Sequence, residues 1–436
     1  MLPAEQLSGP QHRAGHAVAA RKGMHRHNKD IQVLRGVAIL LVLLHHARYH
    51  LYSELSPFWE RFFTYFFGTS GVDLFLVISG FVVSRSFLSS LESSPSRDAM
   101  KVFWIKRLYR IIPAAWVWLG IVLLLTLLVN TSGAFGSFRA AFEGSIAAIL
   151  HVANVRLADC FGVYECGPTT VYWSLSLEEQ FYLLLPLLMI ASGRVLPFIL
   201  MFFVFIQILF PPLTLPDTFR ATGLALGVIL GWYSNTKGYR LFFIGPADRL
   251  KARLLFALLC VCLAVTLHPA LNIVSMRLGY QLVAIVSMIM VYMASMDHID
   301  FFGTGRLRQL MCWIGDRSYS LYLSHMPALY LSIEIAYRLP PEMVARVGLG
   351  TLLTLLFASM SVISAAISYR YLEQPFQRMA RQRISRASPH QEVAQERVAS
   401  ALGIQPGPVP ALDLTPAAGV QEPGEKRAAP AEKALP

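Results

Sequence analysis

Charged residues are scarce in this sequence. Only 15% of its 436 residues are Asp, Glu, Lys or Arg, whereas 55% are hydrophobic and the mean hydropathy is +0.50. An average soluble domain carries roughly 25% charged residues, and a single soluble core could not bury so much apolar surface. The composition therefore excludes an ordinary water-soluble domain and predicts that a lipid bilayer covers much of the protein.

Cysteine is also scarce, with five residues in the chain. This number excludes a small scaffold held together by disulfide bonds. Cys260, Cys262 and Cys312 fall within predicted helices, where a cysteine usually packs as a small apolar side chain. Cys160 and Cys166 fall in a predicted loop, and the sequence leaves open whether they are bonded. No spacing typical of a metal site appears, so we expect neither a metal nor a permanently bound cofactor.

Apolar runs about 20 residues long, the length that a helix needs to cross roughly 30 Å of hydrocarbon, recur along the chain. They predict an all-α, polytopic transmembrane bundle of about ten helices. The first run lacks the cleavage pattern of a signal peptide, so we expect it to remain as a membrane helix. The runs centre on residues 31–50, 62–88, 111–130, 171–192, 195–212, 219–235, 252–268, 277–295, 311–334 and 348–372.

The predicted organisation has one membrane domain, residues 30–380, between two polar ends. Residues 1–29 form a basic arm, and residues 381–436 form a tail rich in Ala, Pro, Glu and Arg. Both ends are expected to be disordered, because such segments cannot bury enough apolar area to offset the entropy of ordering.

Lysine and arginine concentrate in four segments, which predict the orientation of the chain. They are the arm, the stretch 101–110, the loop 237–253 and the tail after Arg370. With ten crossings, these segments lie on one side of the membrane. The positive-inside rule assigns that side, and therefore both termini, to the cytoplasm. The segment 131–170 would then lie outside, where Cys160 and Cys166 could form a disulfide.

Ionisable side chains within the apolar runs are the main functional candidates, because each costs at least about 2.5 kcal/mol at the bilayer centre. Arg35 and His46 are eleven residues apart in the first run. This spacing is close to three helical turns, so both lie on one face, about 16 Å apart along the axis. We predict His46 as a general base and Arg35 as the ligand of an anion. The alternatives are an arginine that reaches the headgroups and an interfacial histidine; His45 points elsewhere.

Asp73 lies among apolar neighbours in GVDLF (71–75) and needs a partner, expected to be Arg or His on an adjacent helix. A structural ion pair and a catalytic role are both open. Lys106, Arg107 and Arg110 lead into the third run. Arg107 and Arg110 share a helical face, which suits the binding of phosphate, whereas simple positive-inside topology is the alternative.

Two further groups of polar residues lie within apolar runs. Glu178 and its neighbour Glu179 are adjacent carboxylates one turn into the fourth run, and we predict a functional role for at least one of them. Ser318, Tyr322 and His325 follow helical spacing and form a polar stripe. This stripe suits binding of a hydroxyl-rich substrate, although hydrogen bonding between helices would also explain it.

Six segments, in this order, resemble acyltransferase family 3, the membrane-bound O-acyltransferases of bacterial envelopes. The resemblance spans roughly residues 30–380. The segments are the Arg35-to-His46 spacing, GVDLFLVISGF (71–81), FWIKRLYRIIP (103–113), YWSLSLEEQFYLLLP (172–186), IGDRSYSLYLSHMP (314–327) and SYRYLEQPF (368–376).

The resemblance implies a ten-helix domain in the bacterial inner membrane. Such a domain takes an acyl group, expected to be acetyl, from cytoplasmic acyl-CoA and transfers it to a hydroxyl of an envelope polysaccharide, lipopolysaccharide, glycolipid or related glycan. It also implies that His46 is catalytic, with Arg35 as its paired motif residue and Arg107 and Arg110 as a basic pair. Glu178 and Tyr322 match further motif positions.

These inferences lead to one mechanistic hypothesis. Arg107 and Arg110, with Lys106 or Arg35, would hold the phosphates of acyl-CoA. His46 would deprotonate the acceptor hydroxyl while Glu178 or Asp73 orients the imidazole; an acyl-histidine intermediate is the variant. The expected partners are acyl-CoA, the glycan acceptor and membrane lipids, not nucleic acid. The alternative is a glycan or lipid transporter, but the inverted repeats and broken helices that would favour it are not seen in the sequence.

Overall fold

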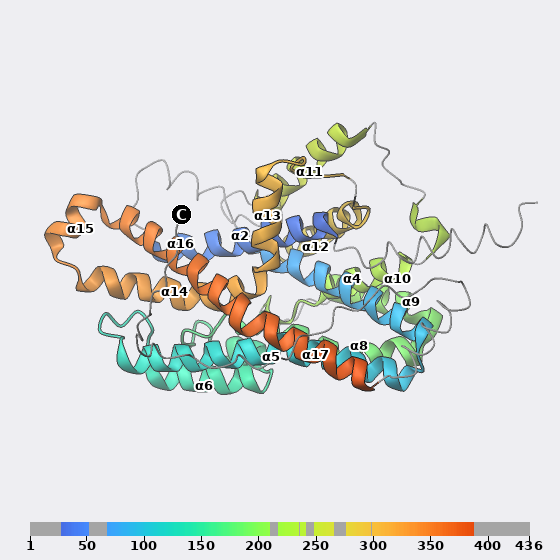
Figure 1. The fold of residues 1–436 in the computed structure, drawn as a ribbon, viewed down its shortest axis with the longest axis horizontal. Helices are drawn as coiled ribbons and strands as arrows, with labels where there is room; N and C mark the ends of the chain where they lie inside the picture. The colour runs from blue at the N-terminus through green and yellow to red at the C-terminus, as the bar shows by residue number, and fades with distance from the viewer. Residues whose placement is uncertain are drawn as a thin grey trace, which may run out of the picture. The chain divides into compact units, whose positions relative to one another are not determined.

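The computed structural model describes residues 28–51, 68–209, 217–234, 236–240, 248–265, 276–297 and 299–387. Within these residues every regular element is a helix, as Figure 1 shows, so the predicted all-α fold is confirmed. Most of the predicted basic arm and most of the predicted tail lie outside the described residues.

Each of the ten predicted apolar runs contains a helix. Among the described residues, six helical segments are long and apolar enough to cross a membrane: Lys29–Arg48, Ser70–Ser93, Ser96–Leu128, Tyr172–Leu209, Leu278–Ser295 and Leu349–Ser385. The helices in the ten runs are α2 (Lys29–Leu51), α4 (Ser70–Ser93), α5 (Ser96–Leu128), α8 (Tyr172–Ser192), α9 (Leu196–Leu209), α10 (Thr222–Tyr233), α11 (Arg249–Val265), α12 (Met276–Ser295), α14 (Ser318–Arg338) and α16 (Leu349–Ser368).

The ninth apolar run was predicted to form one helix, but the structure divides it between two. It holds the end of α13 (Arg306–Asp316) and most of α14, and the two helices meet at Arg317. The α13 sequence RLRQLMCWIGD is too polar and too short to cross a bilayer. The structure also contains α15 (Pro341–Val347), the π-helical turn Tyr369–Glu373 and α17 (Gln374–Ala387), which extends past the predicted start of the tail.

Glycine brings α4 and α10 into backbone contact. A Cβ atom at Gly80 would collide with the carbonyl oxygen of Leu224, and one at Gly227 would collide with that of Val77. Small residues allow this close approach between helices in lipid. Helix α2 packs against both α4 and α13. The result is a tightly packed set of helices around the ionisable residues of α2 and α4.

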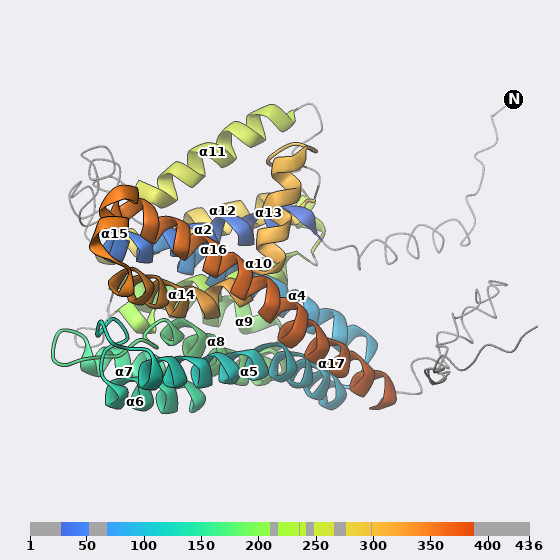
Figure 2. The same ribbon diagram turned by 60° about the vertical axis from the view of Figure 1, so that its left-hand side comes forward.

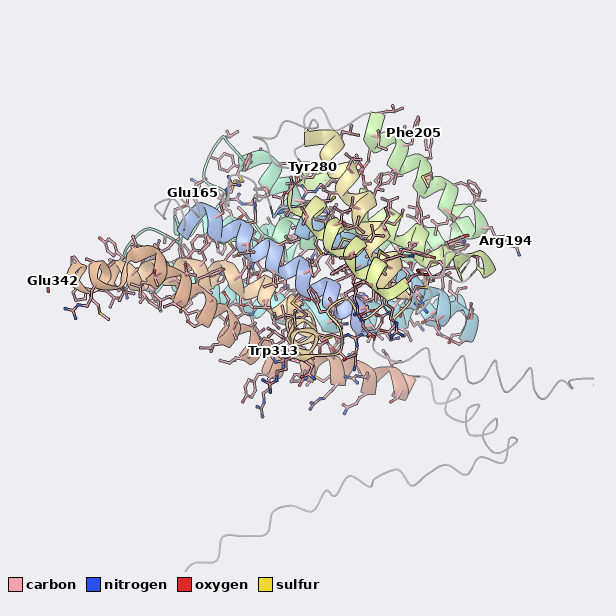
Figure 3. All side chains as sticks on the ribbon, turned by 90° about the horizontal axis from the view of Figure 1, so that it is seen from above. Glu165, Arg194, Phe205, Tyr280, Trp313 and Glu342 are labelled. Atoms are coloured by element: carbon pink, nitrogen blue, oxygen red, sulfur yellow. A yellow bond between two sulfur atoms is a disulfide. The ribbon has the colours of Figure 1, made fainter. Side chains whose placement is uncertain are left out.

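The two ends of the bundle differ. One end, here called the loop end, carries α6 (Phe138–Ile149), α7 (Ala153–Cys160) and α15 (Figures 1 and 2). The arginine-rich helix α17 lies toward the other end, here called the basic end. In Figure 3, Glu165 and Glu342 lie toward the loop end and Arg194 lies at the opposite end. These positions agree with a chain that crosses the bundle from end to end.

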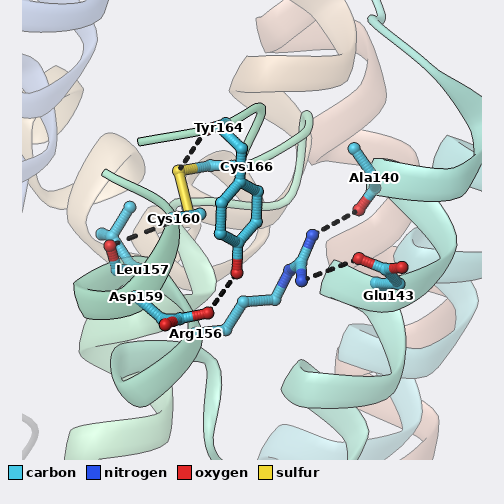
Figure 4. Close-up of a disulfide and its surroundings, with 8 residues drawn as sticks. All are labelled: Ala140, Glu143, Arg156, Leu157, Asp159, Cys160, Tyr164 and Cys166. Carbon is cyan, nitrogen blue, oxygen red and sulfur yellow. Dashed lines mark hydrogen bonds and ion pairs between the residues drawn. A yellow bond between two sulfur atoms is a disulfide. The ribbon is translucent and has the colours of Figure 1, made fainter. Parts of the chain in front are cut away.

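The segment 131–170 was predicted only as a loop, but it folds into α6 and α7. Helix α6 begins after Ser137, whose hydroxyl accepts a hydrogen bond from the amide of Ala140 at 3.2 Å and thereby caps the helix. A disulfide joins Cys160 to Cys166, as Figure 4 shows. The pairing that the sequence left open is therefore present.

Candidate functional site

Two adjoining pockets lie within the bundle, and Val72 of α4 lines both of them. The first, here called the arginine pocket, has about 640 Å³ of empty space and is lined by Arg35, Arg107, Arg110 and Glu178, among others. The second, here called the histidine pocket, has about 710 Å³ of empty space and lies toward the loop end. Its walls include His45, His46, Trp173 and Arg220.

The arginine pocket collects three guanidinium groups from two helices. Arg107 lies 5.4 Å from the ring centroid of Tyr182, and this contact supports the side chain from the side of α8. The Nε atom of Arg35 is buried and has no hydrogen-bond partner among the described residues. One carboxylate, that of Glu178, lines the same pocket. Three positive charges against one negative charge make this pocket suited to a phosphate-bearing ligand.

Polar groups of α8 and α14 form the rest of this pocket. The hydroxyl of Tyr182 donates to Glu178 Oε2 at 3.2 Å. The hydroxyl of Tyr322 donates to the Val171 carbonyl at 2.7 Å, so the Ser174 hydroxyl must be the donor in its own 2.7 Å contact with Tyr322. Tyr322 is thus held in place by two hydrogen bonds.

Only some of the residues predicted to bind the acyl donor, and only some of those in the predicted polar stripe, line the arginine pocket. Lys106 is exposed and does not line the arginine pocket. Ser318 and Tyr322 line this pocket, and their predicted role in binding a hydroxyl-rich substrate stays a prediction. His325 lines neither pocket and is completely buried.

His46 lines the histidine pocket, and its tautomer follows from one contact. Its Nδ1 lies 3.0 Å from the carbonyl oxygen of Val42. Because a carbonyl can only accept, the hydrogen bond requires a proton on Nδ1, which leaves Nε2 as the basic nitrogen of the neutral ring. The backbone of α2 therefore orients this imidazole, a task that the sequence analysis assigned to Glu178 or Asp73.

His325 packs against His46, with 5.0 Å between the ring centroids. Its Nδ1 lies 2.7 Å from the carbonyl oxygen of Tyr322, so its proton also resides on Nδ1. The Nε2 atom of His325 is buried and has no hydrogen-bond partner among the described residues. Such a buried, unsatisfied polar atom costs about 1–3 kcal/mol, which is reason to look for a function.

Asp73 has the arginine partner that its apolar surroundings predicted. Arg220 Nε and Nη2 donate to the two carboxylate oxygens at 2.9 and 3.2 Å. The guanidinium carbon of Arg220 lies 5.0 Å from the ring centroid of Trp173 and 4.2 Å from that of Tyr280. Asp73 therefore anchors an arginine at the histidine pocket, and its predicted catalytic role stays a prediction.

Arg35 and His46 share a face of α2 but line different pockets. The shared helical face therefore does not place the two side chains in one pocket. Val72, on the neighbouring helix α4, forms part of the wall of each pocket. A ligand long enough to extend past Val72 would contact both ends of the α2 stripe.

Two charged residues near the pockets escaped the sequence analysis. Arg220 was overlooked although a lone arginine two residues before the start of the run TGLALGVILG is itself a signal. Glu373 lies in SYRYLEQPF but received no role. It is buried, accepts a hydrogen bond from Ser320 at 3.0 Å and acts electrostatically on Arg35. It lies in a π-helical turn, a feature often found at functional sites.

No group of three or more His, Cys, Asp or Glu side chains that could hold a metal ion is found in the part of the chain that the structure describes.

Comparison with known proteins gives one family. The acyltransferase domain model of acyltransferase family 3 matches residues 28–370. The chain is 28% identical over 384 residues to the peptidoglycan O-acetyltransferase OatA of Listeria monocytogenes, covering 80% of this chain and 56% of that protein. It is 25% identical over 388 residues to the O-acetyltransferase OatA of Staphylococcus aureus, covering 81% and 58%.

The chain thus spans a little over half the length of these relatives. A putative O-acetyltransferase of Staphylococcus aureus strain MSSA476 matches over a similar range, with 24% identity over 395 residues. No solved structure matches the chain.

Proposed function

Because the chain belongs to acyltransferase family 3, we propose that it is a membrane O-acyltransferase that moves an acetyl group from acetyl-CoA to a hydroxyl of a cell-envelope glycan. The observation that carries the proposal is the arrangement of the two pockets. A cationic pocket suited to a phosphate-bearing donor adjoins a pocket that contains a candidate base. The names of the relatives support acetyl as the group transferred and a glycan as the acceptor.

The proposed location is the bacterial inner membrane, with the basic end and both termini in the cytoplasm. The support is the excess of lysine and arginine in the short segments at that end. Acetyl-CoA would then reach the arginine pocket from the cytoplasm, and the acceptor would approach the histidine pocket from outside.

The proposed donor site is the arginine pocket. Arg107 and Arg110 would bind the phosphates of acetyl-CoA, and Arg35 would offer a further donor from α2. The pantetheine arm would extend past Val72 and bring the thioester to His46. In this scheme each arginine replaces some of the water that solvates the phosphates. The helices hold the three guanidinium groups close together before acetyl-CoA binds.

The proposed reaction needs one base. The acceptor oxygen attacks the thioester carbonyl carbon while His46 Nε2 takes the hydroxyl proton; the new C–O bond forms, the C–S bond breaks, and the proton passes to the departing thiolate. While His46 is charged, the neutral ring of His325, with 5.0 Å between the ring centroids and a buried Nε2 that has no partner among the described residues, would offer its lone pair to that charge. His325 would thus stabilise the imidazolium.

The proposal is tested with His46→Ala in purified protein reconstituted into liposomes. Transfer of radiolabelled acetyl from acetyl-CoA to envelope glycan should fall by about 10²–10⁴-fold, the usual contribution of a general base. His45→Ala is the comparison variant, because it removes the other imidazole of the same pocket and leaves the candidate base in place. Transfer by His46→Ala at the rate of His45→Ala would refute the assignment of the base.

The same material separates direct transfer from an acyl-histidine intermediate. Wild-type protein incubated with labelled acetyl-CoA alone would retain label after denaturation only if a covalent intermediate forms. Retained label that disappears in His46→Ala would replace the direct mechanism with the two-step one. A glycan transporter would bind the acceptor without consuming acetyl-CoA.

A further inference from the structure

We propose that the histidine pocket is the acceptor site for a neutral glycosyl unit and that the Cys160–Cys166 disulfide holds the outer wall of this site in place. This inference rests on the proposed function, because it assumes that an acceptor hydroxyl reaches His46 from the loop end.

The outer wall of the pocket comes from the end of α7. Leu157 and Phe161 line the pocket on either side of Cys160 in the chain. Cys160 is completely buried and is bonded to Cys166. The carbonyl oxygen of Cys160 accepts hydrogen bonds from the amides of Val163 and Tyr164, both at 3.0 Å. The segment 160–166 is therefore a short closed turn that carries Phe161 at the pocket.

Helix α7 is held independently of the disulfide. Arg156 forms an ion pair with Glu143 of α6 at 3.0 Å, as Figure 4 shows. The hydrogen bond from Arg139 keeps the pKa of Glu143 below its ordinary value, so this carboxylate stays charged. Loss of the disulfide should therefore release the turn that carries Phe161 more than the helix that carries Leu157.

The disulfide also links two walls of the pocket. Cys160 ends α7, and Cys166 lies on the segment that leads into α8, where Trp173 lines the pocket. The covalent bond thus restrains the position of Phe161 relative to the start of α8. Aromatic side chains at a pocket can pack against the apolar face of a sugar ring, since they combine a large contact area with little conformational freedom.

The charge of the pocket indicates which sugars fit. Among its lining residues in the described part of the chain, Arg220 is the only Asp, Glu, Lys or Arg. Both carboxylate oxygens of Asp73 already bind it, so its charge is largely compensated. The remaining polar groups are the hydroxyls of Thr69 and Thr218, the indole N–H of Trp173 and the two imidazoles. Hydroxyls, imidazoles and rings suit a neutral sugar better than an acidic one.

The test measures acetyl transfer by the full chain in liposomes to two soluble probes of equal length. One is the neutral pentamer of N-acetylglucosamine, and the other is the acidic pentamer of galacturonic acid. Wild-type protein should transfer acetyl to the neutral pentamer. Transfer to the acidic pentamer alone, or to neither one while native envelope glycan is acetylated, would overturn the assignment to a neutral unit.

Phe161→Ala and Val163→Ala form a matched pair for the wall. Phe161 is 71% exposed and Val163 is 77% exposed, both lie in the same disulfide turn, and only Phe161 lines the pocket. Phe161→Ala should raise KM for the accepted glycan roughly 3- to 10-fold, the loss of one aromatic contact, with KM for acetyl-CoA unchanged. Val163→Ala should change neither constant. Equal KM values for the two variants would refute the role of this wall.

The disulfide is tested by replacing Cys160 and Cys166 together with serine. The variant should show the same selective rise in KM for the glycan, with a circular dichroism spectrum like that of the wild type. An unchanged KM for the glycan would refute the role of the disulfide and leave only that of Phe161. If the serine variant does not fold, the comparison of Phe161→Ala with Val163→Ala decides whether this wall binds the glycan. If wild-type protein acetylates no envelope glycan at all, the proposed function itself fails, which is a different result from any of these.

Discussion

The ion pair between Asp73 and Arg220 permits a quantitative prediction. Asp73→Asn removes the carboxylate that binds the guanidinium of Arg220, which lies between Trp173 and Tyr280. The side chains of Asp73 and Arg220 are only 3% and 12% exposed, so water solvates them far less than it would on the surface. Breaking a buried pair by removing one partner costs about 3–5 kcal/mol. We expect Asp73→Asn to lower the free energy of unfolding by this amount.

Two further variants show whether loss of the Asp73–Arg220 ion pair causes this destabilisation. Arg220→Met should be destabilising to a similar degree, whereas the double variant should regain much of the stability, because no buried charge is left alone. Unfolding in mixed micelles, followed by tryptophan fluorescence, gives the three free energies of this double-mutant cycle. If Asp73→Asn unfolds like the wild type and yet loses catalytic turnover, Asp73 acts in the reaction and the ion-pair explanation is wrong.

Two further predictions concern the donor site and His325. Arg107→Ala combined with Arg110→Ala should raise KM for acetyl-CoA by about tenfold or more, because each lost hydrogen bond to a charged phosphate contributes about 1.5 kcal/mol or more. Lys106→Ala, outside the pocket, should leave KM unchanged; equal effects would reduce the arginines to topological signals. His325→Gln, with a polar atom near Nε2, should keep a higher kcat than His325→Asn, which retains only the Nδ1 contact with Tyr322. Equal kcat values would show that His325 only packs.

The helices were predictable because the bilayer imposes a local requirement. Each crossing must satisfy its own backbone hydrogen bonds and present about 20 mainly apolar residues, so most of these helices can be recognised from their own segments, although the break between α13 and α14 could not. The same argument fails at the loop end. There α6 and α7 are short, and their fold depends on a capping serine, an ion pair and the disulfide.

The candidate site was predictable to the level of residue type and helical face. Periodicity placed Arg107 with Arg110, and both line one pocket. It could not show that Lys106 would be exposed or that Arg35 and His46 would line different pockets, because those outcomes depend on α4 and α8. Glu373 escaped because a single carboxylate near a basic tail resembles an ordinary helix end.

By itself, the sequence determined a helical membrane protein with costly charges in its apolar segments, since hydrophobicity and helical spacing are properties of neighbouring residues. Only the tertiary structure decided which charges meet. Asp73 binds Arg220 across 147 positions of the chain, and His46 packs against His325. Such contacts arise when separate helices pack together, and no pattern within one helix specifies the side chains that another helix presents to it.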